Sequence, residues 1–244
     1  MDEIHLSVIL PSYNEEKTIG NTLLAIDRYL SKQGYSYEIV VVNDGSKDKT
    51  AEIVGNFSDL VKNVKLLDNS VNHGKGWAVR QGMLAAKGKY RLIMDTDNST
   101  TIEHLDRAWP HFEKGCSVVI GSRDAKDVKG AKQAVPQSFL KRQMGNMGNL
   151  YIQILAVPGI WDTQCGFKIF AGEAAENIFK RCRVNRWGFD IEVLALAKKF
   201  GYKIGIIPVY WKNRAESKVK FSSYFGVLRD VLKIRWRLMT GRYN

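Results

Sequence analysis

The sequence predicts an α/β fold with a mostly parallel central sheet that is flanked by helices. In the first half of the chain, short β-rich apolar runs alternate with amphipathic helical patterns, and polar or turn-forming residues end each run. Strands that alternate with helices form βαβ units, and the strands of such units lie parallel. A length of 244 residues, 45% of them hydrophobic, suits one large domain or one domain with an appendage.

Five strands are expected in the first half of the chain, with helices between them. Residues 6–10 form a β-rich run that Pro11 ends. The helix over 15–32 is indicated by apolar side chains at helical spacing, namely Ile19, Leu23, Ile26 and Leu30. The elements that follow are a strand at 38–42, a helix at 50–57, a strand at 64–67, a helix at 76–86, a strand at 90–94, a helix at 102–114 and a strand at 117–120.

The second half is less regular and ends in a basic helical tail. Helices are expected over residues 137–155 and 187–200, and a strand over 203–209. The last helix, 222–239, gathers apolar residues on one face with basic residues beside them: Tyr224, Phe225, Leu228, Val231 and Leu232, then Arg229, Lys233 and Arg237. We therefore expect a main domain over residues 1–220 and a basic amphipathic tail over residues 221–244.

The formal net charge of +12 favours partners that carry phosphate, such as nucleotides, nucleic acid or an anionic membrane surface. From residue 212 to the end, nine basic residues stand against two acidic ones, so this region holds more than half of the excess charge. The charge alone would suit a nucleic-acid-binding protein. No helix-turn-helix or RNA-binding motif is present, however, and no nucleic acid partner is expected.

Cysteine usage and hydropathy favour a cytoplasmic protein. Three scattered cysteines, Cys116, Cys165 and Cys182, show neither metal-ligand spacing nor a disulfide framework. The acidic start of the chain argues against a signal peptide, and no apolar run reaches the roughly 18 to 20 residues of a membrane span. Any contact with a membrane is therefore expected to be peripheral.

Polar residues follow the expected strands at the edge where α/β sheets bind ligands. Such residues follow Leu10, Val42, Met94 and Ile120, and the carboxyl ends of parallel strands meet at one edge of the sheet. The alternative is that these are simply polar turns.

Asp95 and Asp97 come directly after the expected strand at 90–94. Two carboxylates so close together repel each other, and a divalent cation relieves this repulsion while it bridges a diphosphate. An Asp-x-Asp match alone is common by chance, but its position at a strand end makes it a candidate site for Mg²⁺ or Mn²⁺.

Several stretches resemble the family 2 glycosyltransferases. Residues 8–16 (VILPSYNEE) resemble the start of that family, and residues 40–50 (VVVNDGSKDKT) match its second landmark, at the right distance from Asp95 and Asp97. Within the family the chain looks closest to the dolichyl-phosphate β-glucosyltransferases. The supporting stretches are 72–83 (NHGKGWAVRQGM), 162–168 (DTQCGFK), 186–192 (RWGFDIE) and the Ser217-Lys218 pair. The resemblance covers about residues 4 to 220, whereas dolichyl-phosphate mannosyltransferases fit the middle less well.

The resemblance implies a GT-A fold and a nucleotide-sugar site. In that reading Pro11, Tyr13 and Glu15 line the nucleotide pocket, and Asp44 contacts the base. Asp95 faces the ribose or the sugar, and Asp97 holds the metal ion. Asn43 departs from the family, which usually has a second Asp at this position, so its effect on base choice stays open; an amide still donates and accepts hydrogen bonds.

Four basic residues are candidates for holding phosphate: Arg123, Arg142, Arg214 and Lys218. The resemblance implies that they bind the acceptor phosphate and the donor diphosphate, and the alternative is a solvated basic surface. Lys75 lies in a glycine-containing loop that lacks the P-loop pattern, and we expect it near the nucleotide.

Asp190 is a candidate catalytic residue with two possible roles. In relatives that glycosylate a hydroxyl group, a carboxylate in this region acts as general base. A phosphomonoester acceptor has a second pKa of about 6, so it is already largely ionised and needs positioning more than deprotonation. We therefore expect a structural or electrostatic role for Asp190.

The expected function is an inverting transfer of glucose from UDP-glucose to a polyprenyl (dolichyl-type) phosphate at the cytoplasmic face of a membrane. Alternatives are the same transfer from GDP-mannose, and transfer to a saccharide or protein hydroxyl with Asp190 as base. The tail and the amphipathic stretch at 137–155 are candidates for lying on the lipid surface, and the alternative is that both helices pack on the domain.

Overall fold

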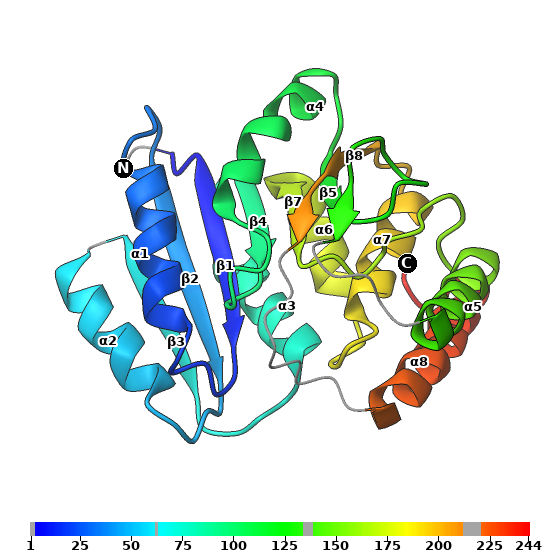
Figure 1. Ribbon diagram of the computed structural model, residues 1–244, viewed down its shortest axis with the longest axis horizontal. Coiled ribbons are helices and arrows are strands. Elements are labelled where there is room, and N and C mark those ends of the chain that lie inside the picture. Colours follow the sequence, from blue (N-terminus) through cyan, green and yellow to red (C-terminus); the bar gives the residue numbers. More distant parts are fainter. Residues whose placement is uncertain (1–2, 62, 134–138, 212–220) are drawn as a thin grey trace.

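The central element of the structure is a seven-stranded sheet in the order β3-β2-β1-β4-β7-β5-β8 (Figure 1). It is seen in a computed structural model that describes residues 3–61, 63–133, 139–211 and 221–244. The strands are β1 (Leu6–Ser12), β2 (Tyr37–Asp44), β3 (Val64–Asn69), β4 (Tyr90–Met94), β5 (Val118–Ser122), β7 (Phe167–Ala171) and β8 (Ile204–Pro208). Every pairing is parallel except those of β7, which runs antiparallel to both β4 and β5. The expected mostly parallel sheet is confirmed.

Helices cover both faces of the sheet (Figure 1). They are α1 (Ile19–Leu30), α2 (Thr50–Leu60), α3 (Lys75–Ala85), the 3₁₀ helix η1 (Ile102–Arg107), α4 (Trp109–Glu113), α5 (Phe139–Leu155), α6 (Gly172–Arg181), α7 (Phe189–Lys199) and α8 (Phe221–Met239). A short pair, β6 (Lys132–Gln133) and β9 (Tyr210–Trp211), lies outside the main sheet.

Alternate side chains of the strands enter two different cores. In β1, Leu6, Val8 and Leu10 belong to the core under α1, whereas Ile9 packs with the residues of α3. Successive side chains of a strand point to opposite faces, and with helices on both faces neither set reaches water. This arrangement explains why the strands are continuous apolar runs and why their polar residues are confined to their ends.

Two expectations from the sequence differ from the structure. The single helix expected over 102–114 is divided into η1 and α4, because Pro110 lacks the N–H that a continuous helix needs, whereas a proline is tolerated in the first turn of a new helix. The strand β7 and the helix α6 were not expected. The β7 segment is a five-residue run that contains Lys168, and periodicity does not classify so short a run.

The C-terminal helix α8 is packed into the domain. It lies against α5 and α7, and Val231, Ile234 and Tyr243 are buried in the same core as α7. The Tyr243 hydroxyl donates to Glu192 Oε1 at 2.5 Å, and Glu192 is fully buried. The expected boundary between residues 220 and 221 adjoins residues 212–220, which lie outside the described residues, so the division into two units stays a prediction.

The buried Glu192 also fixes the loop before α7. The backbone N–H groups of Arg183 and Val184 donate to its carboxylate at 2.9 and 2.8 Å. Burial raises the pKa of Glu192, although these N–H groups and the Tyr243 hydroxyl favour the ionised form. One carboxylate therefore joins the end of the chain to the 183–184 loop.

Within the described residues, none of the helices combines the length and the apolar character that crossing a bilayer requires.

We expect that Tyr243→Phe lowers the free energy of unfolding by about 1–3 kcal/mol, because it removes a donor from a buried carboxylate. Urea unfolding monitored by circular dichroism measures this change. Tyr210→Phe is the control, since Tyr210 is exposed on β9, and its effect should stay within about 0.5 kcal/mol. Equal stability of the two variants would contradict the anchoring role of Tyr243.

Candidate functional site

The carboxyl ends of β1, β2, β4 and β5 meet at one edge of the sheet. Because β7 is antiparallel to both of its neighbours, β4 and β5 run in the same direction as β1 and β2. The residues that follow these strands, including Tyr13, Asp44, Asp95 and Arg123, are therefore brought to the same side, where ligands bind in open α/β sheets.

The loops after β1 and β2 are joined by reciprocal hydrogen bonds. The Asn14 N–H donates to Ser46 Oγ and the Lys47 N–H donates to Asn14 Oδ1, both at 2.8 Å. The Glu15 N–H donates to Thr50 Oγ1 at 2.7 Å. Asn14 has a φ of 53°, a left-handed conformation that Asn tolerates better than most residues. This network places the predicted nucleotide-binding residues Pro11, Tyr13 and Glu15 beside the loop that follows β2.

Asn43 bridges β2 and β3. Its Nδ2 donates to Asp68 Oδ1 at 2.6 Å, and its Oδ1 accepts the Ser46 N–H at 3.2 Å. An ionised Asp at position 43 could not donate to Asp68. The departure from the family pattern therefore has a local structural reason, and the Asn43 amide is occupied by the protein itself.

Asp44 is buried, and its carboxylate organises the loop that leads into α3. It accepts the backbone N–H groups of His73 and Gly74, each at 2.8 Å, and the Asn72 side-chain amide at 3.0 Å. The ring of His73 stacks on Trp77 with centroids 4.1 Å apart. The residue predicted to contact the base thus also sets the path of the 72–74 loop.

Lys75, the first residue of α3, pairs with Asp95. Its Nζ lies 2.5 Å from Asp95 Oδ1 and 5.5 Å from the centre of the Trp187 ring. Burial alone would lower the pKa of Lys75, but Asp95, Asp190 and Asp97 outweigh it and raise that pKa above its ordinary value. Lys75 therefore lies beside the strand-end carboxylates, and its expected position near the nucleotide stays a prediction.

Gly166 leaves the space that the Asp95 carboxylate occupies. A Cβ atom at position 166 would lie 1.9 Å from Asp95 Oδ2, which is far inside van der Waals contact. Gly166 precedes β7, so the antiparallel strand delivers this glycine to the end of β4. Sequence reasoning used Gly166 only as part of a motif and missed its steric role.

Asp97 and Asp95 are both partly exposed, and Asp97 is oriented by its own turn. The Ser99 N–H donates to Asp97 Oδ1 at 2.8 Å, and Asn98 has a φ of 54°. Beside it, the buried Asn98 Oδ1 and Ser99 Oγ have no hydrogen-bond partner among the described residues.

Asp95 and Asp97 suit an open metal site, in which substrate and water complete the coordination, better than a site enclosed by protein ligands. The part of the chain that the structure describes holds no group of three or more His, Cys, Asp or Glu placed to bind a metal. Mg²⁺ commonly binds through one or two carboxylates and takes its remaining ligands from phosphate and water. Two partly exposed carboxylates beside unsatisfied oxygen atoms suit that mode of binding.

Arg123 is held by Asp162. Its Nε and Nη2 each donate to the Asp162 carboxylate at 2.7 Å, and its backbone N–H donates to the same group at 2.8 Å. Although burial opposes ionisation of Asp162, the guanidinium holds the pKa of that carboxyl below its ordinary value. The guanidinium also lies 5.6 Å from the Trp211 ring. Arg123 therefore lies at the predicted edge, with its backbone N–H and two of its side-chain donors engaged by Asp162.

Asp190 forms a buried ion pair with Lys168. Lys168 Nζ lies 2.5 Å from Asp190 Oδ1 and 2.6 Å from the Cys165 carbonyl oxygen, and both side chains are buried. Burial raises the pKa of Asp190, although Lys168 and Lys75 favour its charged form. This geometry supports a positional role for Asp190. Lys168 was missed because a lysine in a strand gives no sequence signal of burial.

Three further predicted residues cannot be placed. Arg214 and Lys218 lie outside the described residues, and Arg142 lies on α5 with its side chain outside them. Their predicted contacts with phosphate stay predictions.

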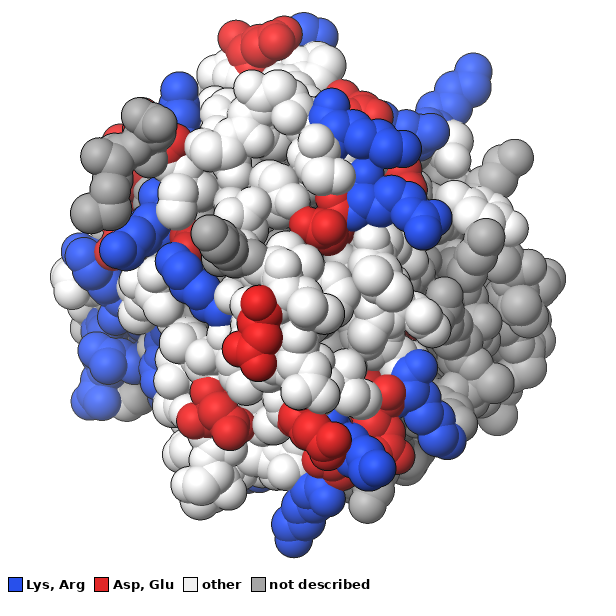
Figure 2. All heavy atoms as spheres, turned by 90° about the vertical axis from the view of Figure 1, so that its left-hand side faces the viewer, with Lys and Arg blue, Asp and Glu red and all other residues white. Residues whose placement is uncertain are grey.

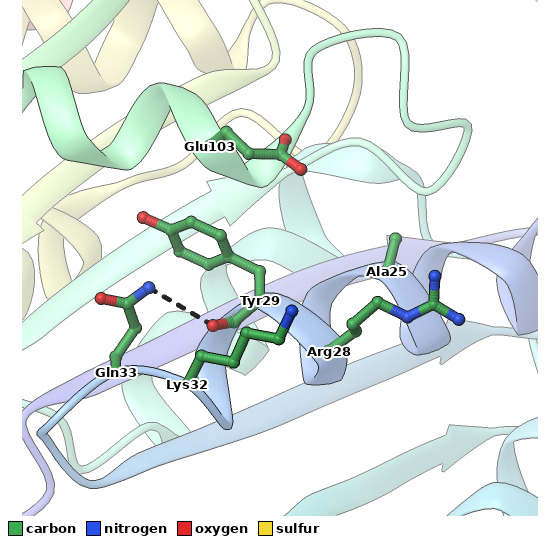
Figure 3. Close-up of a pocket in the computed structure, with 6 residues that line it drawn as sticks. All are labelled: Ala25, Arg28, Tyr29, Lys32, Gln33 and Glu103. Carbon is green, nitrogen blue, oxygen red and sulfur yellow. Dashed lines mark hydrogen bonds between the residues drawn. The ribbon is translucent and has the colours of Figure 1, made fainter.

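A separate pocket lies along α1 and η1 (Figure 3). It is lined by Ala25, Arg28, Tyr29, Lys32, Gln33 and Glu103. None of these residues belongs to the strand-end set, so this pocket is distinct from the candidate site.

A family model described as "Glycosyl transferase family 2" matches residues 7–179. A dolichyl-phosphate β-glucosyltransferase of Dictyostelium discoideum is 36% identical over 99% of this chain and 77% of its own length. One from Trichomonas vaginalis is 39% identical over 95% of this chain and 73% of its own length.

Solved structures share the fold at lower identity. Mannosyl-3-phosphoglycerate synthase from Rubrobacter xylanophilus superposes with a TM-score of 0.70 at 18% identity, over 98% of this chain and 75% of its own. A mannosyltransferase from Pyrobaculum calidifontis, in complex with GDP-Man and Mn²⁺, gives a TM-score of 0.62 at 18% identity, over 98% and 70%. These likenesses confirm the expected GT-A fold.

We expect that Lys168→Met destabilises the fold by about 3–5 kcal/mol, because it leaves Asp190 buried without its partner. Protonation relieves a buried carboxylate whose pKa is raised, so the deficit should be smaller near pH 4.5 than near pH 7.5. Chemical unfolding at both pH values measures it. As a control, Lys180→Met removes an exposed i,i+4 pair with Glu176 and should cost less than about 0.5 kcal/mol. A deficit that does not change with pH would contradict this account.

Proposed function

The chain belongs to glycosyl transferase family 2 and is a glycosyltransferase, and on that premise we propose that it transfers glucose from UDP-glucose to a dolichyl-type polyprenyl phosphate. The observation that carries this proposal is an identity of 36% and 39%, over 99% and 95% of the chain, to two proteins named dolichyl-phosphate β-glucosyltransferase. Among the described motif residues, Tyr13, Asp44 and Asp95 follow strands whose carboxyl ends meet at one edge of the sheet, which supports the proposal.

The donor nucleotide is proposed to bind across the loops that follow β1 and β2. Tyr13 is exposed there, and the network through Asn14 and Ser46 joins the two loops. Pro11 and Glu15 complete the proposed pocket, and Asp44 is proposed to meet the base. Because the Asn43 amide is engaged by Asp68, we propose that Asn43 shapes the pocket without reading the base directly.

Asp97 and Asp95 are proposed to hold Mg²⁺ or Mn²⁺. The support is the pair of partly exposed carboxylates and the Mn²⁺ found in a structural neighbour with the same fold. When bound, such an ion neutralises charge on the leaving diphosphate. Lys75 already pairs with Asp95, so we propose that its ammonium stays beside the diphosphate and adds to that neutralisation.

The proposed reaction is a direct displacement with inversion. An oxygen of the acceptor phosphate attacks the anomeric carbon of glucose while the bond from that carbon to the UDP oxygen breaks, and an α-linked donor gives a β-linked lipid phosphate. A phosphomonoester with a second pKa of about 6 is already ionised, so no general base is needed. The pairing of Asp190 with Lys168 supports this reading.

The basic residues are proposed to position the two phosphate groups. The Nε and Nη2 groups of Arg123 donate to the Asp162 carboxylate. The proposed contribution of Arg123 is therefore a fixed positive charge near the site, together with its remaining N–H groups. Arg142, Arg214 and Lys218 are proposed to bind phosphate directly.

A lipid-linked acceptor requires the enzyme to work at a membrane surface, and we propose peripheral association with the cytoplasmic face. The three cysteines are buried and unpaired, as is usual in a reducing compartment. The excess of basic residues suits the anionic lipids of a cytoplasmic leaflet.

Incubation with labelled sugar nucleotides, with and without a polyprenyl phosphate, tests the reaction. We expect a lipid-soluble labelled product from UDP-glucose only when the acceptor is present, and its loss when EDTA removes divalent cations. Asp97→Asn should lower the rate on the order of 100-fold or more, whereas Asp59→Asn, an exposed change on α2, should not. A lipid product from GDP-mannose but not from UDP-glucose would overturn the donor assignment.

Gly166→Ala tests the placement of Asp95. Since the added Cβ must displace the Asp95 carboxylate, we expect the transfer rate to fall about 100-fold, as misplacements of about 1 Å commonly cause. Gly55→Ala is the matched control, because nothing lies within 4 Å of its added Cβ in α2. Full activity of a folded Gly166→Ala variant would show that the position of Asp95 is not critical.

A further inference from the structure

Exposed apolar side chains are concentrated on α5 and α8. Nine of the fifteen large hydrophobic residues that are exposed in the described part of the chain lie on these two helices. We call them the α5–α8 surface: Met147, Leu150, Ile154, Tyr224, Phe225, Leu228, Leu232, Trp236 and Met239. Exposed apolar side chains that gather on neighbouring elements mark interaction sites in soluble proteins.

Both helices present these residues as a stripe while another stripe enters the core. On α5, Met147, Leu150 and Ile154 follow i, i+3, i+7 spacing, and Ile152 is buried. On α8, Leu228, Leu232 and Met239 lie on an outer stripe. The helices contact each other, and the Tyr151 hydroxyl donates to the Leu228 carbonyl oxygen at 3.4 Å.

The helix α8, which carries most of the α5–α8 surface, is anchored in the core of the domain. Val231 and Ile234, on the inner side of α8, are buried without solvent exposure, and Tyr243 anchors the segment that follows on Glu192. Since the inner side of α8 is occupied by the core, the outer apolar residues of this helix face away from it.

Positive charge borders this surface. Arg229, Lys233, Arg235 and Arg242 are all exposed. The one acidic residue of α8, Asp230, is partly buried, and its carboxylate lies against Gly188. Residues 139–155 contain no acidic residue at all. The molecule differs on the side formed by α1 and α2, where acidic and basic residues are interspersed (Figure 2).

We propose that the α5–α8 surface docks on a lipid bilayer that contains anionic headgroups, with its apolar side chains in the interface and its basic residues on the lipid phosphates. A second copy of the chain is a poorer occupant, because a two-fold contact through one surface would bring the same basic residues together. The inference deepens the proposed function, since a lipid-linked acceptor would be met on that bilayer.

Three leucines of almost equal exposure make the test specific. Leu150 on α5 is 53% exposed and Leu232 on α8 is 54% exposed, and Leu24 on α1, also 54% exposed, is the matched control. Each is replaced by Glu in the full chain, and unfolding curves verify that every variant is folded. Co-sedimentation with phosphatidylcholine vesicles, with and without phosphatidylserine, measures binding.

We expect Leu150→Glu and Leu232→Glu each to lower the vesicle partition coefficient about tenfold, because each variant loses the free energy that a leucine side chain gains on moving from water into the bilayer. Leu24→Glu should leave the partition coefficient unchanged. Binding by the wild type should also weaken when phosphatidylserine is left out. Equal losses in all three variants would overturn the proposal, and so would a change in oligomeric state of Leu232→Glu with vesicle binding intact.

The docking and the reaction are tested separately. Vesicle binding is measured without sugar nucleotide, and transfer is measured with a short, water-soluble polyprenyl phosphate. All three variants should transfer glucose to the short acceptor at the wild-type rate, and Leu150→Glu and Leu232→Glu should be slow only with an acceptor embedded in vesicles. Transfer to the short acceptor without vesicle binding by the wild type would reject the docking surface and leave the proposed function standing.

Discussion

Asp44, Asp162, Asp190 and Glu192 are all buried, and each of them must be paired inside the protein. An ionised carboxylate that leaves water without partners is costly enough to unfold a domain. Here the partners come from the loops around the site: backbone N–H groups for Asp44 and Glu192, a guanidinium for Asp162 and an ammonium for Asp190. The need to pair these carboxylates therefore determines the conformation of the loops at the carboxyl edge of the sheet.

The same pairing leaves the site with an ordered arrangement of charge. Lys75, Arg123 and Lys168 each rest on a carboxylate of the protein, so their positions do not depend on a ligand. A site whose charges are already oriented spends little energy on reorganisation when a charged substrate arrives. Asp97 differs, because within the described part of the chain its hydrogen bond comes from a backbone N–H of its own turn alone, and it is the carboxylate best placed to change partners.

Most of the sheet and the centre of the site could be predicted from the sequence. Asp95 and Asp97 follow a strand that is apolar because helices cover both of its faces, and this pattern is local. The roles of Gly166 and Lys168 could not be predicted, because they depend on β7 lying antiparallel between β4 and β5. That placement is decided by long-range pairing. The burial of Asp190 likewise depends on Lys168, which is distant in the sequence and gives no periodic signal.

The burial of Tyr243 has a consequence for how the protein is made. The core that contains α7 also includes Ile234 and Tyr243, which lie far beyond α7 in the sequence and leave the ribosome after it. The strands and helices that precede α7 can pair as they leave the ribosome. Glu192, in contrast, has no hydroxyl partner until Tyr243 has been synthesised. Until residue 243 emerges, the face of α7 that packs against α8 is uncovered, and exposed apolar surface of this kind is prone to aggregation or to capture by chaperones. This part of the core therefore cannot be completed during synthesis until residue 243 has left the ribosome.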